Sequence, residues 1–210
     1  MYAKQADGTG GEQGVLPNEG SSYFNPDAVS PDGKNIVLTQ PGGILGDLWM
    51  TAFGDKPKPT QLKTNAAGAE FSPDGKYIAY SSQQSGAYSV FVDTFPIGGG
   101  EWQVSLENGA YPRWSKGGRE LVYYEAGQNI MMSVDVELKP TFHAGPPHEL
   151  FTLAASEFSP MQTNPAVNFD VSADGERFVF LQVSNGAEQA SATLSVTLNL
   201  PEQIRELAKK

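Results

Sequence analysis

The stretch FSPDGKYIAYSS, residues 71–82, decides the fold, because it places a tight turn between two apolar segments. Pro presets φ for the first turn position, Asp can accept hydrogen bonds from amides further along the chain, and Gly tolerates positive φ. Apolar segments on both sides of such a turn are typical of two antiparallel strands. The stretch therefore predicts a β-hairpin whose reversal depends on Asp74 and Gly75.

The same hairpin pattern recurs along the chain. SPDG occurs at Ser30 and Ser72, SKGG at Ser115 and SADG at Ser172, with spacings of 42, 43 and 57 residues. An apolar, β-rich run follows each turn, at residues 35–40, 77–82, 120–125 and 177–182. A third run follows the next loop in each unit, at residues 47–53, 88–95, 129–136 and 192–199. A fourth run follows in most units, near residues 62, 104 and 151. Four short strands in each unit indicate a propeller blade.

The predicted fold is therefore all-β: a β-propeller or partial propeller of about four four-stranded blades over residues 1–200. The expected units lie near 24–66, 67–109, 110–154 and 166–200, with a partial leading blade over 1–20. Residues 201–210, PEQIRELAKK, begin with Pro and contain helix-forming residues, which predicts a short C-terminal helix.

Two accounts of the blade number stay open. In the first, which we favour, the chain is the C-terminal part of a larger propeller whose other blades lie upstream. In the second, the N-terminal strand pairs with residues 192–199 and closes a small ring. Unpaired edges in the first account would favour association of two copies into a homodimer.

The turn residues are expected to have a structural role. Asp and Gly at these positions serve the chain reversal, and the copy at Ser115 has no Asp, which argues against a catalytic role for the motif. The residues expected to hold the turns are Asp32, Gly33, Asp74, Gly75, Asp174 and Gly175.

Composition excludes several classes of function. The chain has 210 residues, a formal net charge of −10 and no cysteine. Acidic proteins repel phosphate backbones, so no nucleic-acid partner is expected. Disulfides and thiolate metal sites are excluded, and no apolar run approaches the roughly 20 residues of a membrane-spanning helix. The content of apolar residues is that of a globular chain with a real core.

The first strand of each blade supplies the candidate binding residues. The apolar residue directly before each turn Ser is expected to pack between blades, so its neighbour must face the other side of the strand. Those neighbours are Ala28, Glu70, Arg113 and Asp170. Glu70, Arg113 and Asp170 are therefore candidates for the mouth of a central channel; alternatively, they are merely solvated.

Two aromatic residues are candidate interface anchors. Trp102 follows a glycine run, and Tyr88 lies near the start of a predicted strand. Aromatic side chains suit protein interfaces. The alternative is that both rings simply cover the blade core.

No metal, cofactor or catalytic triad is expected. His143 and His148 are the only histidines, and the Gly-Pro-Pro between them prevents a helix that would align them as ligands. The chain contains no G-x-S-x-G nucleophile motif.

FSPDGKYIAYSS, PRWSKGGRELVYY and FDVSADGERFVFL resemble the PD40, or TolB-like, relatives of WD40 repeats. The longer run through VFVDTFP, WQVS and FHAGPPHELF is similar to the C-terminal propeller of bacterial proteins that carry a serine/threonine kinase domain. The resemblance covers the chain from about residue 24. None of the kinase motifs occurs here, so the resemblance does not imply kinase activity.

This resemblance implies a non-catalytic protein-interaction or sensory scaffold, with a protein partner and an extracytoplasmic, periplasmic location. A small ligand is a further possibility. The alternatives are a lyase or glycan-processing enzyme with Glu70, Arg113 and Asp170 at the channel mouth, or a regulatory cap on a separate catalytic domain. An enzyme needs those side chains in one pocket, whereas a scaffold does not.

Overall fold

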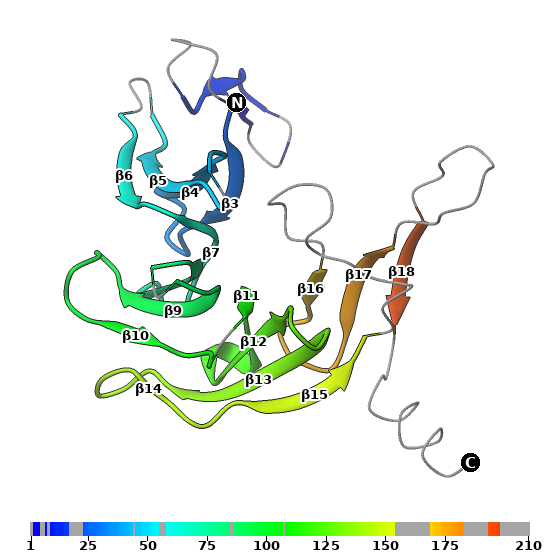
Figure 1. Ribbon diagram of the computed structural model, residues 1–210. Helices are drawn as coiled ribbons and strands as arrows, with labels where there is room; N and C mark the ends of the chain where they lie inside the picture. Colours follow the sequence, from blue (N-terminus) through cyan, green and yellow to red (C-terminus); the bar gives the residue numbers. More distant parts are fainter. Residues whose placement is uncertain are drawn as a thin grey trace. The chain divides into compact units, whose positions relative to one another are not determined.

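The computed structural model describes residues 2–4, 7, 9–16, 23–43, 45–54, 58–84, 86–106, 108–153, 169–182 and 193–197 (Figure 1). It divides into two compact units, residues 1–111 and 112–210, which are described separately. The only helical element in the described ranges is a 3-10 turn, Lys116–Gly118. Within the described part, no helix is long and apolar enough to cross a membrane. The helix expected over 201–210 lies outside the described residues.

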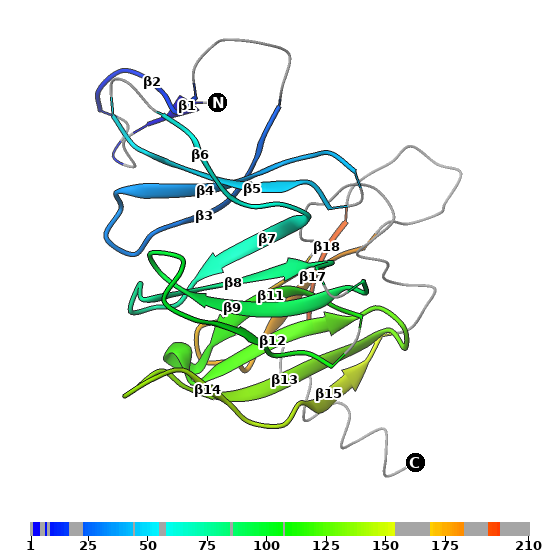
Figure 2. The same cartoon turned by 60° about the vertical axis from the view of Figure 1, so that its left-hand side comes forward.

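The first unit contains two four-stranded antiparallel sheets, which Figure 2 shows as successive layers. The first blade consists of β3 (Asn25–Val29), β4 (Asn35–Gln40), β5 (Asp47–Ala52) and β6 (Thr60–Lys63). The second consists of β7 (Ala66–Phe71), β8 (Tyr77–Ser82), β9 (Ser89–Thr94) and β10 (Glu101–Gln103). Strands β1 (Tyr2–Ala3) and β2 (Gln13–Gly14) form a separate two-stranded sheet.

Strand β11 (Gly109–Ser115) crosses the division between the units and starts the next sheet. That sheet continues through β12 (Glu120–Glu125), β13 (Ile130–Glu137), β14 (His143–Ala144) and β15 (His148–Thr152). The last sheet contains β16 (Phe169–Val171), β17 (Phe178–Gln182) and β18 (Thr193–Thr197). The predicted all-β fold of antiparallel, four-stranded blades is confirmed, whereas the exact boundaries of the units stay predictions.

One strand was not expected from the sequence. β14 and β15 both pair with the long strand β13, β14 with its C-terminal end and β15 with its N-terminal half. Gly145, Pro146 and Pro147 separate them, and Pro has no N–H to donate to a ladder. The outer edge of this blade is therefore broken into two short strands.

The turns use the same hydrogen bonds in three blades. In the second blade, the Ser72 hydroxyl donates to Asp74 Oδ1 at 2.8 Å and accepts the Tyr77 N–H at 3.0 Å. Asp74 Oδ1 also accepts the Lys76 N–H at 3.1 Å. Gly75 has φ of 69°, and a Cβ there would lie 3.5 Å from Pro31 in the turn of the first blade.

The same arrangement at the other two Asp-containing turns lowers the pKa of Asp32 and of Asp174. In each case the largest cause is the hydrogen bond from the turn Ser, followed by the backbone N–H two residues after the Asp. These carboxylates are therefore held in their charged, acceptor form.

Apolar side chains fill the space between the two blades of the first unit. The buried members of this cluster are Val37, Leu48, Ala66, Ala69, Phe71, Ile78, Tyr80 and Phe91. Phe71, directly before a turn Ser, meets Phe95 edge-on at 4.9 Å. In the second unit, Phe151 of β15 meets Phe178 of β17 edge-on at 5.2 Å. Burial of these faces against one another is the main stabilising term.

The expectation that every apolar residue before a turn packs between blades is wrong for one position. Phe71 and Trp114 are 5% and 6% exposed, whereas Val29 is 50% exposed. The short sheet β1–β2 provides a smaller covering surface: Val15 packs with Ile36 and Leu38 in a separate, small cluster. Ile36 and Leu38 belong to β4, and Val29 of β3 is not a member of this cluster.

In each of the first two blades, a buried hydroxyl of the second strand accepts a backbone N–H from the first strand of the next blade. Thr39 of β4 accepts the Gly68 N–H at 3.4 Å, and Ser81 of β8 accepts the Tyr111 N–H at 2.7 Å. Gly68 and Tyr111 both have positive φ, 65° and 56°. This conformation turns the N–H out of the normal ladder, so a side-chain acceptor must satisfy it.

Ser81→Ala removes the acceptor of the buried Tyr111 N–H. We expect a loss of about 1–3 kcal/mol in the free energy of unfolding, the usual range for an orphaned buried donor. Denaturant unfolding monitored by tryptophan fluorescence measures it. Thr60→Ala, at the exposed start of β6, is the control and should change stability little. Equal losses in the two variants would contradict the role of Ser81.

Candidate functional site

The structure brings together two of the three candidate channel residues. Arg113 lies on β11 and Asp170 lies on β16, in two different sheets. Arg113 Nε is 3.8 Å from Asp170 Oδ1. The Arg113 side chain is 15% exposed and that of Asp170 is 70% exposed. Arg113 Nη1 also donates to the Pro112 carbonyl at 3.0 Å. The pair thus presents an exposed carboxylate beside a mostly covered guanidinium.

Glu70 belongs to the first unit and is described there by itself. It lies on β7, opposite Ala79 of β8, and is half-buried. A bulge separates it from Ala67 in the register of β7 with β8. Its assignment to a channel mouth stays a prediction.

The two candidate aromatic anchors differ in their surroundings. Trp102 of β10 is half-buried and meets Tyr77 edge-on at 6.2 Å, so at least part of its ring covers the blade. Tyr88 directly precedes β9, and burial raises its pKa. Leu106, which the sequence did not single out, is 73% exposed. Roles for these side chains at an interface stay predictions.

The histidines lie on the two short strands that pair with β13. His143 is opposite Glu137, His148 is opposite Ser133, and both side chains are exposed. Across the described ranges, no three side chains of His, Asp or Glu are grouped in a way that could hold a metal ion.

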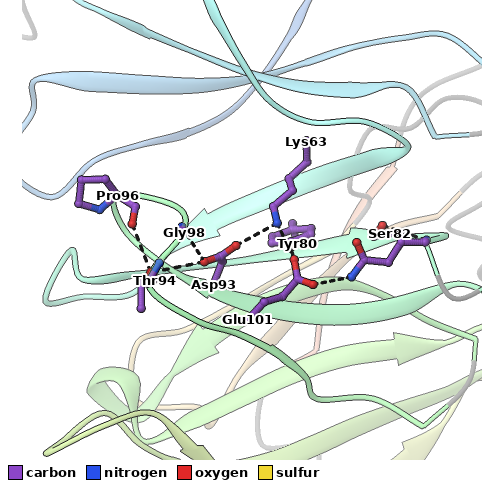
Figure 3. A network of polar contacts seen from close by, with 10 residues as sticks. Lys63, Tyr80, Ser82, Asp93, Thr94, Pro96, Gly98 and Glu101 are labelled. Atoms are coloured by element: carbon purple, nitrogen blue, oxygen red, sulfur yellow. Dashed lines mark hydrogen bonds and ion pairs between the residues drawn. The ribbon is translucent and has the colours of Figure 1, made fainter.

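The sequence did not reveal a polar cluster between the first two blades, which Figure 3 shows. We call it the Lys63 cluster; its members are Lys63, Tyr80, Gln84, Asp93 and Glu101. Lys63 Nζ lies 3.0 Å from Asp93 Oδ2 and 2.5 Å from Glu101 Oε2. Tyr80 donates its hydroxyl to Glu101 Oε2 at 2.6 Å, and Gln84 donates to Oε1 at 2.8 Å. Lys63 comes from β6, so the cluster joins one blade to the next.

Part of the Lys63 cluster is withdrawn from water, whereas Glu101 and Gln84 are exposed. Asp93 is 2% exposed and Tyr80 is fully buried. The Lys63 side chain is 22% exposed, and its Nζ lies over the Tyr80 ring, 5.6 Å from the centroid. Tyr80 stacks in turn on Phe91 at 6.1 Å. The charged groups therefore rest directly on the apolar cluster between the blades.

Burial and hydrogen bonding set the protonation states of the Lys63 cluster. Burial disfavours the charged form of Lys63, but hydrogen bonds to Glu101 and Asp93 outweigh it and raise the pKa. Burial also opposes ionisation of Glu101, but donation from Lys63, Tyr80 and Gln84 lowers its pKa. Burial, then the bond to Glu101, raises the pKa of Tyr80. All three shifts move titration away from neutral pH, which suits a fixed ion pair better than proton exchange.

One signal in the sequence could have pointed to this cluster. Asp93 lies opposite Ile78 in the β8–β9 pair, and the matching positions in the other blades are Thr51, opposite Ile36, and Val134, opposite Leu121. A carboxylate at a position that other blades fill with Thr or Val requires a partner. That partner, Lys63, lies 30 residues upstream in another blade, which the repeat pattern does not reveal.

The third blade replaces the missing turn Asp with a buried Glu. Glu120 of β12 is 3% exposed and accepts hydrogen bonds from the Ser115 hydroxyl, from Lys116 Nζ at 2.7 Å and from Ser133 Oγ at 2.8 Å. Burial alone would raise the pKa of Glu120, but these three donors together lower it. The carboxylate is thus supplied by the second strand instead of the turn.

Stability should fall in acid because of Glu101. Its folded-state pKa lies below the ordinary value of 4.5, so its contribution is present above that value and is lost as pH falls through the folded pKa. The measurement is the free energy of unfolding as a function of pH, from neutral pH to below the folded-state pKa of Glu101. Glu101→Gln should flatten the acid limb, while Thr60→Ala, which removes no carboxylate, should leave it unchanged. An unaltered slope in Glu101→Gln would contradict this assignment.

Comparisons with known proteins agree with the blade architecture. No family model matches the chain. The Tol-Pal system protein TolB of Anaeromyxobacter dehalogenans strain 2CP-C is 34% identical over 84 residues, which are 40% of this chain and 19% of that protein. The matched region thus spans about a fifth of the length of this curated relative.

Solved structures show the same fold. TolB from Acinetobacter baumannii matches 92% of this chain and 44% of its own length, with 17% identity and a TM-score of 0.60. A putative 6-phosphogluconolactonase from Bacteroides fragilis matches 94% of this chain and 64% of its own, with 10% identity and a TM-score of 0.51. The resemblance to propellers of kinase proteins is not tested by these matches. The chain therefore has antiparallel β-propeller blades, and it is similar to the TolB proteins of Anaeromyxobacter dehalogenans and Acinetobacter baumannii.

Proposed function

We propose that this chain is a non-catalytic scaffold that binds a protein partner through the ends of its first strands. The observation that carries the proposal is the Arg113–Asp170 pair, in which an exposed carboxylate lies 3.8 Å from a mostly covered guanidinium and accepts the Val171 N–H at 2.9 Å. A side chain fixed in this way loses little conformational entropy when a partner binds. The match to a protein named for the Tol-Pal system supports a protein as the partner.

The electrostatics of the described part also support a scaffold. Lys63, Glu101 and Glu120 are fully engaged within the fold, and their pKa shifts lead away from neutral pH. A general acid or base for catalysis works best with a pKa near the working pH. Packed blades provide a rigid support for the loops and strand ends that a partner would contact.

The test is affinity capture from extracts of the native cells, with the bound proteins identified by mass spectrometry. Arg113→Ala and Asp170→Ala should each lose one specific protein that the wild type retains. Lys34→Ala, a matched change in charge at an exposed turn, should retain it. Equal recovery by all variants would overturn the proposal, provided that thermal unfolding shows each variant to be folded.

The enzymatic alternative uses the same residues differently. A lyase or glycan-processing site would need Glu70, Arg113 and Asp170 in one pocket. The match to a putative 6-phosphogluconolactonase concerns the fold alone and supplies no residue for such a site. A regulatory cap on a separate catalytic domain is the third reading. Turnover of a substrate by the purified chain, lost in Asp170→Ala, would favour the enzyme over the scaffold.

We further infer an extracytoplasmic, periplasmic location from the resemblance to TolB proteins, and a parent protein with additional domains of the kinase-propeller type. Association of two copies through open sheet edges belongs to the same proposal. Light scattering over a concentration series measures it: a dimer would support open edges, and a monomer of 22.5 kDa would favour a closed ring.

A further inference from the structure

The contact between the first two blades defines two kinds of sheet face. Phe71, directly before the turn Ser72, and Val37 of β4 belong to one buried cluster. We call the side of a sheet that carries the residue before the turn Ser its leading face, and the opposite side its trailing face. In the first unit, the leading face of the second blade therefore packs on the trailing face of the first blade.

The leading face of the first blade is partly uncovered. Val29, directly before its turn Ser, is 50% exposed, whereas Phe71 at the equivalent position is buried. The turns differ in the same way. A Cβ at Gly75 would lie 3.5 Å from Pro31 of the preceding blade, but a Cβ at Gly33 would have no described atom within 4 Å. The first blade thus lacks the neighbour that covers the second.

The last sheet has the matching, partly uncovered trailing face. Val179 of β17 pairs with Asp170, as Val37 of β4 pairs with Ala28. Val37, and Ala79 at the equivalent position of the second blade, are completely buried. Val179 is only half-buried. The described part of the chain therefore carries one uncovered face of each kind.

We propose that the leading face of the first blade in one copy of the chain packs on the trailing face of the last sheet in a second copy. The inference rests on the association of two copies included in the proposed function, and it names the sheet faces that meet. A second copy is the fitting occupant, because every copy supplies both faces. Burial of Val29 and Val179 would favour the contact. Such a head-to-tail contact either closes into a ring or continues to further copies.

The turns indicate how the two faces align. A Cβ at Gly175 would lie 3.1 Å from Lys116, the residue directly after the turn Ser of the preceding blade. The contact between the turns of the first two blades involves the same two positions. In the last sheet, the residue directly after the turn Ser is Ala173, which is exposed. We therefore place Ala173 of one copy against Gly33 of the other.

The first test is light scattering of the purified chain over a concentration series. We expect a mass of at least two copies of the 22.5 kDa chain. Val29→Arg should weaken association roughly tenfold or more, because it places a charge in the contact. Leu106→Arg, at an even more exposed apolar residue of the first unit, is the control and should associate normally. A wild type that stays monomeric, or a Val29→Arg variant that associates as well as wild type, would overturn the proposal.

The second test uses the absence of cysteine from the chain. Mild oxidation of a mixture of Gly33→Cys and Ala173→Cys should join the two chains by a disulfide. Gly43→Cys, at another exposed glycine with positive φ, replaces Gly33→Cys in the control mixture and should not form this bond. A disulfide within one chain of the double variant Gly33→Cys/Ala173→Cys, with none between chains in the mixture, would contradict the contact between copies.

Asp170→Ala separates this inference from the proposed protein partner. It removes the exposed carboxylate of the Arg113–Asp170 pair. It also places Ala where the first blade has Ala28, which packs against the buried cluster between the first two blades. Association of the copies should therefore persist in this variant while the captured protein is lost, so that the two proposals succeed or fail separately.

Discussion

Tyr80→Ala is expected to have the largest effect of any single substitution in the first unit. Tyr80 is fully buried, stacks on Phe91 at 6.1 Å and donates its hydroxyl to Glu101 at 2.6 Å. Truncation of a buried aromatic ring leaves a cavity and costs about 3–5 kcal/mol. The ring also lies beneath Lys63 Nζ, so its loss removes the surface on which the ion pairs rest.

The measurement is the free energy of unfolding in denaturant, with the slope compared to that of the wild type to check for a change in cooperativity. Tyr80→Phe is the matched control, because it keeps the ring and removes only the hydroxyl. It should cost about 1.5–3 kcal/mol, the usual contribution of a hydrogen bond to a charged group. Similar losses in the two variants would show that the ring contributes little, contrary to our account of the blade interface.

Glu120→Leu is expected to have the second-largest effect. The substitution removes the acceptor of Ser115, Lys116 and Ser133 at once. Ser115 and Ser133 are buried, so their hydroxyls must find other partners or remain unpaired. Loss of one member of a buried charge cluster costs about 3–5 kcal/mol, because the remaining polar groups lose compensation.

Glu120→Gln separates charge from shape. It retains an acceptor oxygen and the approximate volume, so we expect about half of the loss seen with Leu. Thermal unfolding followed by circular dichroism compares both variants with Glu125→Gln, a change at the half-buried end of the same strand. If Glu120→Leu proved as stable as the wild type, the turn at Ser115 would not depend on this carboxylate.

Much of the fold could be predicted from the turn motif, because Ser and Gly recur at the same spacing four times and the turn Asp recurs three times. These residues specify the reversal, and a strand of apolar residues follows each turn. Strand β14 could not be predicted in this way, since it has two residues and depends on the length of its partner β13.

The sites were less predictable than the fold. The repeat pattern predicted equivalent positions for Arg113 and Asp170 in successive blades. In the structure, Arg113 Nε lies 3.8 Å from Asp170 Oδ1. It gave no indication that Lys63 meets Asp93 and Glu101, because contacts between blades depend on how sheets stack and not on the pattern within a strand. Glu120 was missed for a similar reason: its role appears only once β12 is folded back onto the turn.

The bonds between the first two blades have a consequence for how this unit opens. Thr39 accepts the Gly68 N–H, and Lys63 pairs with Asp93 and Glu101, so two separate polar links join the blades. The buried apolar cluster between the blades also contains residues of both, so separating the blades exposes core residues of each. Amide hydrogens of β4 and β8 should therefore exchange with deuterium at a common, slow rate, as one cooperative folding unit rather than two.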